Sequence, residues 1–554
     1  MSKLKAPEPE FYEFQKKPPS LLDELVQLLQ RLLDYCLCCL TCGCYPGNGN
    51  GFQGDILETA LTEEERVSVR NLLRYLDSAV AKHPTINDER LRALCILTYS
   101  GNQELQRSAA LCFVELSERM RDGLTEIQME PLVVLLRSRD IQIEKAATLA
   151  VSNFVLNGPE SNKKLILSSG VLAPLIQLLQ SENTEVQCNT CGCITTIVTT
   201  GKYTCYYMIT LITTNQSKRE LVTSGGIAPL IELVNSYDIR VKRNATGALL
   251  NLTHLQSSRN ELVRQGALPV LIQALHSDDP EVQYYSIAAL SNFAVHEKHR
   301  TMMVAVGHFD IIFQLIKLLG CVREKVLCQA CLALRNLASD ADNQVLIVEL
   351  GSLPFLHLVM KHYLKETLAA SVACLRNLSI HRANEAIITS GAVEALVTVL
   401  MESRTEISVL GEVTAALAVL TDEEEARLRL LGIHPSLTLH TLLSLAKDSQ
   451  STEVSYNCAG AVGQLSLSEL PQEVLRENTA GFMGYLEKFM ISDDPSNLHM
   501  ALWTLNQLLK YESFLKIFRA SSLEPLLHRY SVQGQSEAIQ ELADSALIRL
   551  KQST

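Results

Sequence analysis

The amino-acid sequence predicts an all-α solenoid, in which one helical unit of about 41 residues is repeated along the chain. Three observations lead to this prediction. At 554 residues the chain is several domains if globular, and one object only if it is an elongated repeat array. Its composition is 47% hydrophobic and 5% aromatic, with one tryptophan, which suits helices rich in Leu, Ala and Val. Two separate sequence anchors also recur with one period.

The first anchor is a helix-breaking glycine followed by an apolar helix, as in SGVLAPLIQLL from Ser169 and SGAVEALVTVL from Ser390. The second anchor is an asparagine near the end of the unit, as in LSNF with Asn292 and LRNL with Asn336. Two independent anchors that share a period indicate a helical solenoid. The aligned glycines are Gly170, Gly225, Gly266, Gly307, Gly351, Gly391, Gly432 and Gly481.

Each unit is expected to contain three helices: a short one closed by the glycine, a second one, and a long third one. The stretch SDDPEVQYYSIAALSNFAV shows the start of the third helix best, with Asp279 as N-cap and Pro280 at the first helical position. Its apolar residues fall mostly on one face and must meet neighbouring units: Val282, Ile287, Leu290 and Phe293. Three helices per unit of about 41 residues is the armadillo pattern, so we expect a right-handed superhelical solenoid.

The equivalents of the asparagine anchor form a ladder along the chain, which predicts about eleven repeats over residues 56–552, with 56–100 as an irregular N-terminal cap. The ladder positions are Glu115, Asn153, Thr196, Asn251, Asn292, Asn336, Asn377, Val419, Gln464, Gln507 and Arg549. The interval between Gly170 and Gly225 is longer than the others, and we place the extra residues near 199–215. This insertion is compatible with a surface loop, a distorted helix extension, or a product of alternative or mispredicted splicing.

Several stretches carry a more specific resemblance, among them LQRSAALCFVELSE, IRVKRNATGALLNLTH, CQACLALRNLASD and ASVACLRNLSIHRANE. Together with DPEVQYYSIAALSNFAV, they are similar to the fungal vacuolar protein 8 family, armadillo proteins related to β-catenin. The likeness runs in register over about residues 60–400 and then weakens to periodicity. It implies a membrane-anchored scaffold on the cytoplasmic face of the vacuole or a lysosome-like organelle, with a cytosolic pool. The family's implied roles are organelle tethering, vacuole inheritance and fusion, and autophagy-related targeting.

The N-terminal segment, residues 1–55, is expected to be disordered apart from an amphipathic helix over 20–35 and a cysteine-rich patch over 36–44. In the family resembled here, the chain begins with a myristoylated glycine and palmitoylated cysteines, whereas this chain begins with Met1, Ser2 and Lys3. A leucine stripe on the helix can lie in a membrane interface and bring the patch to the acyl boundary. We therefore predict S-acylation at Cys36, Cys38, Cys39, Cys42 and Cys44.

Other interpretations of this segment stay open. The leucine stripe can dock on the first repeats or pair with a second copy of the chain, so homodimerisation is a further option. Cys39 and Cys42 form a CxxC that could bind zinc, but the usual distant second pair is absent. A chemically inert, reduced patch is the third option.

The solenoid is expected to bind extended segments of partner proteins in a groove lined by the third helices. An asparagine carboxamide can both donate to and accept from a peptide backbone, which predicts a ladder of four sites: Asn251, Asn292, Asn336 and Asn377. Arg335 and Arg376 directly precede two of them and can pair with acidic side chains of a partner. The alternative is that each asparagine only bonds to neighbouring helix backbone.

Charge and terminal sequence narrow the class of function. The 49 Lys and Arg residues against 61 Asp and Glu residues give a net charge of −12, which argues against a broad phosphate-binding surface, so no nucleic-acid partner is expected. The start MSKLKAPEPEFYEF lacks the features of a signal peptide, and no apolar run reaches about 18 residues. We therefore expect a cytosolic chain with reduced cysteines.

Among armadillo proteins, the importin-α class is disfavoured. Importin-α carries a ladder of tryptophans beside its asparagines, whereas the single tryptophan here, Trp503, accompanies Gln507. A soluble cytosolic or junctional scaffold of the β-catenin kind remains the alternative to a vacuolar one.

No enzyme, cofactor or metal is expected, because the sequence has no phosphate loop, HExxH motif or Gly-Ser-Gly elbow. Cysteines within apolar helix stripes should be buried as small hydrophobic residues: Cys95, Cys112, Cys331 and Cys374. His254, His296 and His381 lie about a repeat apart, too far to share an ion, and are interpreted as C-terminal helix residues favoured by the helix dipole.

Overall fold

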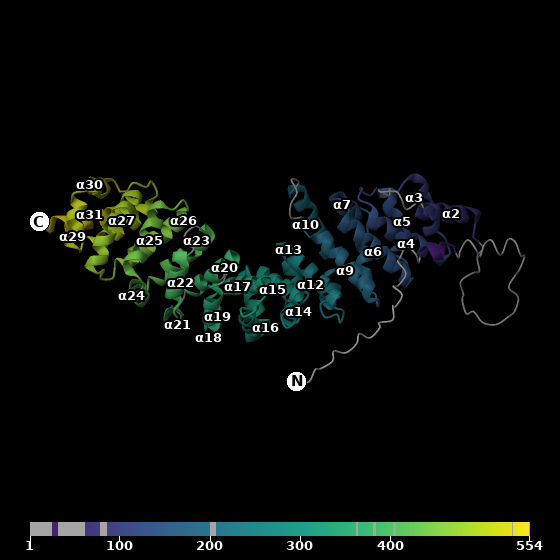
Figure 1. The fold of residues 1–554 in the computed structure, drawn as a ribbon, viewed down its shortest axis with the longest axis horizontal. Coiled ribbons are helices and arrows are strands. Elements are labelled where there is room, and N and C mark those ends of the chain that lie inside the picture. Colours follow the sequence, from purple (N-terminus) through teal and green to yellow (C-terminus); the bar gives the residue numbers. More distant parts are fainter. Residues whose placement is uncertain are drawn as a thin grey trace, which may run out of the picture. The chain divides into compact units, whose positions relative to one another are not determined.

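The computed structural model describes residues 25–30, 61–77, 86–199, 207–361, 364–380, 384–402, 406–534 and 536–552. These residues are almost entirely helical, and no strand occurs among them, as the sequence predicts. They divide into two compact units, the first ending at Ala267 and the second beginning at Leu268 (Figure 1). The predicted acylation patch, residues 36–44, lies outside the described residues.

The first unit contains the helices α2 to α13. Their bounds are α2 (Glu63–Asp77), α3 (Asp88–Thr98), α4 (Gln103–Arg119), α5 (Glu126–Leu135), α6 (Ile141–Asn157), α7 (Glu160–Ser168), α8 (Leu172–Leu178), α9 (Thr184–Val198), α10 (Tyr207–Thr223), α11 (Ile227–Leu233), α12 (Ile239–Thr253) and α13 (Gln256–Arg264). The group α7 to α9 is a short, a second and a long third helix, as expected for one repeat, whereas in the group α10 to α12 the first helix is also long.

The second unit continues the same pattern from α14, which begins at the boundary, to α31. Its helices are α14 (Ala267–Ala274), α15 (Pro280–Ala294), α16 (Glu297–Leu318), α17 (Glu324–Leu337), α18 (Ala341–Glu349), α19 (Ser352–Val359), α20 (Lys365–Leu378), α21 (Asn384–Thr389), α22 (Ala392–Glu402), α23 (Ile407–Leu420), α24 (Glu424–Gly432), α25 (Pro435–Asp448), α26 (Thr452–Leu465), α27 (Gln472–Met490), α28 (Pro495–Leu508), α29 (Glu512–Arg519), α30 (Glu524–Gln533) and α31 (Glu537–Gln552).

The third helices pack on one another in order and form one continuous layer within each unit. In the first unit these are α4, α6, α9 and α12, and in the second α15, α17, α20, α23, α26, α28 and α31. Every predicted ladder position lies on a helix of this kind. The period read from the sequence therefore places equivalent residues side by side on successive helices.

Among the described third helices, α6, α9, α12, α15 and α28 share a start signal, whereas α17, α20 and α23 have no side-chain cap. In the helices that share it, the N-cap side chain accepts a hydrogen bond from a backbone N–H of the first turn, and a serine two residues earlier accepts one from the N-cap N–H. This Ser-x-Asp or Ser-x-Asn pair recurs at Ser138 and Asp140, Ser181 and Asn183, Ser236 and Asp238, Ser277 and Asp279, and Ser492 and Asp494. The predicted N-cap Asp279, followed by Pro280, is confirmed.

The predicted helix breaks are confirmed at five glycines, fall at or directly after Gly307 and Gly432, and are wrong at Gly481. The five have a left-handed backbone between the first and second helices: Gly170, Gly225, Gly266, Gly351 and Gly391. In two other repeats a histidine has this backbone instead, His308 with φ 48° and His434 with φ 46°, close to Gly307 and Gly432. Gly481 lies inside the continuous helix α27, where a Cβ atom would approach the Leu443 side chain to 3.1 Å. That glycine permits close packing and does not break a helix.

Cations do lie at the C-terminal ends of third helices, but they are arginines rather than the predicted histidines. Arg300 Nη1 donates to the Ala294 carbonyl at 3.0 Å, and Arg427 Nη1 donates to the Thr421 carbonyl at 2.8 Å. Burial, followed by the charges of Lys218 and Arg259, lowers the pKa of His254. His254 is the C-cap residue of α12, so its predicted position is confirmed, but its pKa is lowered and not raised as a favourable helix dipole would raise it. His381 lies outside the described residues.

The core follows the predicted apolar stripes. Val282, Ile287, Leu290 and Phe293 are all fully buried, which confirms the face assigned to α15. Cys112, Cys331 and Cys374 are buried as predicted, and burial raises the pKa of the Cys374 thiol to about 12. Cys95 is only half-buried, because it lies on α3 near the beginning of the array, with fewer helices to cover it.

Two features of the first unit bear on the other predictions. Helix α10 has 17 residues where α7 and α13 have nine, and residues 207–215 of the predicted insertion belong to it. The short helix over 25–30 has two fully buried leucines, Leu25 and Leu29. That burial favours the alternative in which the leucine stripe docks on the protein.

Within the described ranges no single helix is long and apolar enough to span a bilayer. Only the two parts of α16, Glu297–His308 and Asp310–Leu318, bent by 94°, reach that length and composition together. Ile311, Ile312 and Leu315 of this helix are fully buried in the second unit.

Candidate partner-binding surface

The predicted ladder asparagines lie half-buried on the outward side of the third helices. Asn251 lies on α12 in the first unit, and Asn292, Asn336 and Asn377 lie on α15, α17 and α20 in the second. Because successive third helices pack side by side, the three asparagines of the second unit follow one another along one face. The structure thus brings together the residues that the period selected there.

Two of these asparagines make the same pair of contacts. The side-chain Nδ2 of Asn336 donates to the Ser291 carbonyl at 3.0 Å, and that of Asn377 donates to the Arg335 carbonyl at 2.9 Å. In each case the preceding arginine donates to the Oδ1 atom, with Nη2–Oδ1 distances of 3.2 Å for Arg335 and 3.1 Å for Arg376. Both ends of the carboxamide therefore already have partners, one of them on the preceding repeat.

The first unit repeats the inter-helix contact with side-chain acceptors. The Nδ2 atom of Asn153 donates to Ser117 Oγ at 3.1 Å, and that of Asn251 donates to Thr199 Oγ1 at 2.9 Å. These hydrogen bonds link neighbouring repeats and are the contacts expected of a structural role. A partner backbone would use the remaining lone pair of Oδ1 or replace one of these bonds.

Arg376 carries a further contact that Arg335 does not share. Its Nη1 atom lies 2.8 Å from Glu412 Oε2 on α23, with the two side chains 28% and 25% exposed. An acidic partner residue would have to compete with this carboxylate at Arg376. The two arginines are therefore not equivalent as binding groups, although the sequence presents them in identical LRNL motifs.

The next three third helices of the second unit, α23, α26 and α28, enclose an open hollow of about 650 Å³. Its surface is mainly apolar, with small residues at its floor and larger ones at its sides: Ala415, Ala418, Gly460, Tyr456, Met500 and Trp503. Here the ladder positions are Val419, Gln464 and Gln507, and no arginine precedes them. This part of the third-helix layer therefore presents an apolar surface, whereas the asparagine ladder presents carboxamides that are bonded within the protein.

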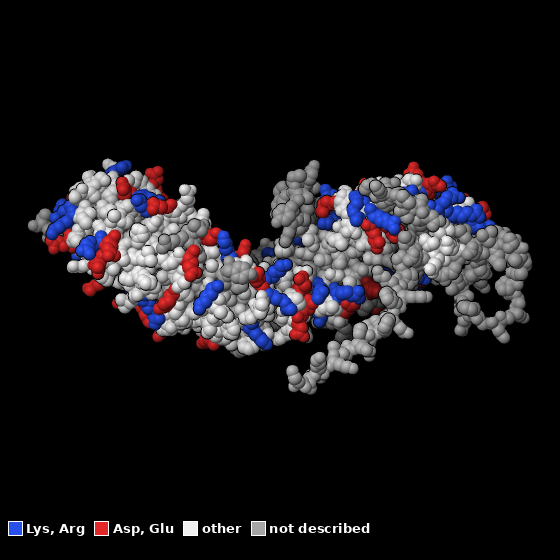
Figure 2. Space-filling model, viewed as in Figure 1, with Lys and Arg blue, Asp and Glu red and all other residues white. Residues whose placement is uncertain are grey.

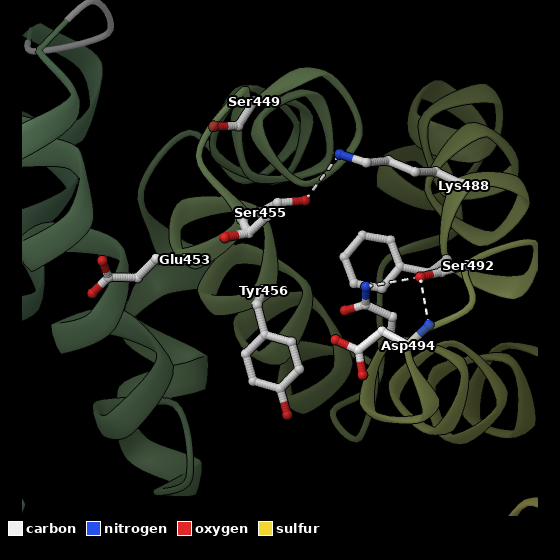
Figure 3. A pocket seen from close by; sticks show the side chains of 10 residues that line it. Ser449, Glu453, Ser455, Tyr456, Lys488, Ser492 and Asp494 are labelled. Carbon is white, nitrogen blue, oxygen red and sulfur yellow. Dashed lines mark hydrogen bonds between the residues drawn. The ribbon is translucent and has the colours of Figure 1, made fainter.

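A second, polar pocket of about 470 Å³ adjoins the same helices and shares Tyr456 with the apolar hollow. Figure 3 shows Lys488 pointing at Ser455, to which its Nζ donates at 3.0 Å. The same Nζ donates to the Ala446 carbonyl at 2.9 Å, and burial lowers its pKa. Lys488 therefore fastens α27 to α26 and is held in place by the protein itself.

The first unit has a hollow of about 390 Å³ lined by α4, α6, α9 and α12. Three cations line it, Arg107, Lys145 and Arg240, but Lys145 pairs with Glu185 and Arg240 pairs with Asp238. Its charges are thus largely neutralised within the protein. Figure 2 likewise shows acidic and basic side chains interspersed on the face in view.

The described residues supply no group of three His, Cys, Asp or Glu side chains that could hold a metal ion. Burial raises the pKa of the Cys112 thiol to about 12 and that of Cys331 well above its ordinary value, so neither is a nucleophile near neutral pH. The chemistry offered by this surface is binding.

Repeats of three helices, a ladder on the third helices and left-handed junctions define an armadillo-repeat protein. The family model of the armadillo/β-catenin-like repeat matches residues 159–199, 214–254 and 257–295. Vacuolar protein 8 of Schizosaccharomyces pombe is 36% identical over 499 residues, covering 82% of this chain and 87% of that protein. Vacuolar protein 8 of Candida albicans is 36% identical over 517 residues, covering 85% and 84%. The chain belongs to the vacuolar protein 8 family.

Solved structures show the same fold. An engineered protein is 25% identical, with a TM-score of 0.66 over 77% of this chain and 99% of its own. A structure from work on the phosphorylation switch in the interaction between cadherin and β-catenin has a TM-score of 0.70 and 15% identity, covering 88% and 96%. These likenesses agree with the armadillo architecture read from the repeats.

The sequence reasoning missed the apolar hollow. The signal for it is the position four residues before the ladder position, which is Ala415, Gly460 and Trp503 in three successive repeats. Reading this register across repeats would have placed two small residues beside one large aromatic ring. In the sequence analysis, Trp503 serves only to distinguish this chain from importin-α.

Proposed function

We propose that this protein is a membrane-attached armadillo adaptor of the vacuole, which binds extended segments of partner proteins along its third helices. The family membership supports the vacuolar location, and the layer of third helices supports the binding mode. Organelle tethering, vacuole inheritance, fusion and autophagy-related targeting are the processes in which such an adaptor would act. It would hold proteins together and catalyse no reaction.

The single observation that carries the binding mode is the regular series Asn292, Asn336 and Asn377 on successive helices, with Arg335 and Arg376 beside it. Armadillo repeats present such a series at the spacing of the repeat, which suits a partner in extended conformation. The hydrogen bonds to the preceding repeat fix the orientation of the Asn336 and Asn377 carboxamides. Preorganised groups lose less side-chain entropy when a partner binds.

The test replaces Asn292, Asn336 and Asn377 by Ala and Arg335 and Arg376 by Glu in the full chain. Proximity labelling should then lose a distinct set of partners while vacuolar location is kept. Stability should fall by about 1 kcal/mol for each lost asparagine hydrogen bond. The matched control is Asn343→Ala on α18, the first helix of its repeat. It loses a hydrogen bond to the Leu337 carbonyl at the end of α17 and should keep the partners. An unchanged partner set in the ladder variant would contradict the proposed groove.

Membrane attachment is proposed to rest on S-acylation of the cysteines at 36–44, because the buried Leu25 and Leu29 leave less of the preceding helix for a membrane. Each acyl chain contributes about 0.8 kcal/mol per buried CH₂, so two or more chains give stable attachment. Replacing Cys36, Cys38, Cys39, Cys42 and Cys44 by Ser should release the protein to the cytosol. Hydroxylamine should remove an acyl label from the wild type alone. Membrane retention of the all-serine variant would refute this anchor.

A further inference from the structure

The apolar hollow between α23, α26 and α28 differs from the rest of the third-helix layer in what it leaves unfilled. Gly460 lies on its floor, and a Cβ atom added there would meet nothing closer than Met500 Cε at 3.9 Å and Ala418 Cβ at 4.0 Å. The ring of Trp503 and the 40% exposed ring of Tyr456 border the same space. A Cβ atom therefore fits at Gly460 in ordinary van der Waals contact, and the hollow of about 650 Å³ that this residue lines has room for a larger side chain.

An asparagine in this hollow has an unused donor. Asn457 lies seven residues before its ladder position, Gln464, and its Nδ2 atom is buried without a hydrogen-bond acceptor. The residue in the same register of α12 is Asn244, whose Nδ2 donates to the Cys188 carbonyl of the preceding third helix at 3.1 Å. A buried donor without an acceptor costs about 1–3 kcal/mol, which a small rotation of the carboxamide toward a bound acceptor would recover.

The charged residues at the edge of the hollow are acidic. Asp422 at its edge is exposed and accepts a hydrogen bond from Gln464, and Glu423 and Glu424, which follow it, are exposed too. The only basic residue in the lining is His499, and no lysine or arginine lines the hollow. This edge therefore attracts cations and disfavours an acidic segment.

We propose that this hollow is a side-chain pocket for an extended partner segment, which inserts one large apolar residue over Gly460 and carries a basic residue next to it. A backbone carbonyl of the segment accepts from Asn457 Nδ2, and the basic residue faces Asp422. The pocket would add partner selectivity to the proposed adaptor function, and this inference rests on that function. It would select partners by one side chain, while the asparagine ladder binds backbone.

Trp503 gives a direct readout, because it is the single tryptophan of the chain and lines the pocket. The probes are short synthetic peptides of Gly and Ser with a central Leu-Phe pair and a lysine on each side. Two control peptides replace Leu-Phe by Ala-Ala, or the lysines by glutamates. The lysine peptide with Leu-Phe should shift the Trp503 emission of the intact protein and bind at least about tenfold more tightly than either control.

Two variants test the site itself. Gly460→Leu fills the pocket and should weaken the Leu-Phe peptide at least about tenfold, while Gly460→Ala adds one methyl group and should change affinity much less. Neither should lower the melting temperature, since both residues favour a helix more than glycine does. Asn457→Leu removes the donor and serves as a second variant that should also weaken binding.

The outcomes separate this pocket from the proposed function. Binding that Gly460→Leu and Asn457→Leu leave unchanged, but Arg335→Glu with Arg376→Glu abolishes, would overturn the pocket and keep the asparagine ladder. Failure of every peptide, together with an unchanged partner set in the ladder variant, would overturn both. Trp503 emission that depends on protein concentration without peptide would identify a second copy of the chain as the occupant and would also overturn the proposal.

Discussion

The asparagine ladder lies on α17 and α20, and the apolar hollow lies on α23, α26 and α28. All five are third helices of their repeats, yet the two regions present different chemistry. In the ladder, each carboxamide is held at both ends, by the preceding repeat and by an arginine. In the hollow, the equivalent helices carry small residues and an asparagine Nδ2 without an acceptor. A repeat array can thus keep one packing scheme while a few outward positions change what it binds.

The largest expected effect is on the packing that shapes the hollow. At Gly463 an added Cβ would approach Trp503 Cζ3 to 2.5 Å and Thr504 Oγ1 to 2.9 Å. Gly463→Ala should therefore displace the ring and destabilise the fold by about 2 kcal/mol, despite the gain in helix propensity. Gly460→Ala, one turn earlier, would make only ordinary van der Waals contacts, with Met500 Cε at 3.9 Å and Ala418 Cβ at 4.0 Å, and should instead stabilise by up to about 1 kcal/mol. Urea unfolding followed by Trp503 fluorescence measures both, and equal effects would show that the hollow is not shaped as described.

The second prediction compares one asparagine from each region. Asn377→Ala removes a hydrogen bond to the Arg335 carbonyl and should cost about 1 kcal/mol. Asn457→Ala removes a buried donor without an acceptor and so relieves a cost of about 1–3 kcal/mol, which offsets the lost packing; the free energy of unfolding should therefore stay the same or rise. Thermal or urea unfolding of the two variants gives the comparison. A loss at Asn457 as large as that at Asn377 would mean that its carboxamide already has a partner.

A smaller effect is expected from the ion pair that closes the ladder toward α23. A double-mutant cycle of Arg376→Gln and Glu412→Gln should give a coupling energy of about 0.5 kcal/mol, because both side chains are partly exposed. High salt should reduce this coupling. The stability difference between Gly460→Ala and the wild type should not respond to salt. A coupling near zero at low salt would remove the distinction between Arg335 and Arg376.

The smallest effect concerns the cysteines beneath both regions. Cys374 lies on α20 and Cys458 on α26, both are fully buried, and burial raises the pKa of each thiol. Iodoacetamide at neutral pH should leave both unmodified in the native protein and label both after unfolding, as measured by mass spectrometry. Native labelling of Cys458 alone would indicate that the hollow opens into the core, and the two regions would then differ in depth as well as in surface chemistry.

Much of the fold could be predicted because it depends on local patterns. The apolar stripe of α15, its N-cap Asp279 and five left-handed glycines follow from residue type and spacing. The errors arose where another residue satisfied the same requirement. His308 and His434 have the left-handed backbone at junctions assigned to glycines. Arginines donate to the last carbonyls of α12 and α15, the helix ends at which His254 and His296 were predicted. The period fixes that a turn or a helix end is needed, but several side chains can meet that need.

The candidate site was predictable only in part. The ladder positions Asn336 and Asn377 were found, because they recur at a fixed register, but their hydrogen-bond partners were not. The hollow escaped because its residues are separated by a whole repeat, and only the packing of α23 against α26 and of α26 against α28 brings Ala418, Gly460 and Trp503 together. Small residues on one helix have no meaning until the neighbour that faces them is known.

By itself, the sequence determined that this protein is an array of three-helix repeats and which residues share a register, since helix period, capping and apolar spacing act within a few residues of one another. Tertiary structure alone decided which side chains at those positions already have hydrogen-bond partners within the protein. Whether Asn377 or Asn457 has an acceptor depends on the carbonyl groups that the adjacent repeat presents. Hydrogen bonding and packing across repeats are set by distances between chain segments about 40 residues apart, which no local pattern encodes.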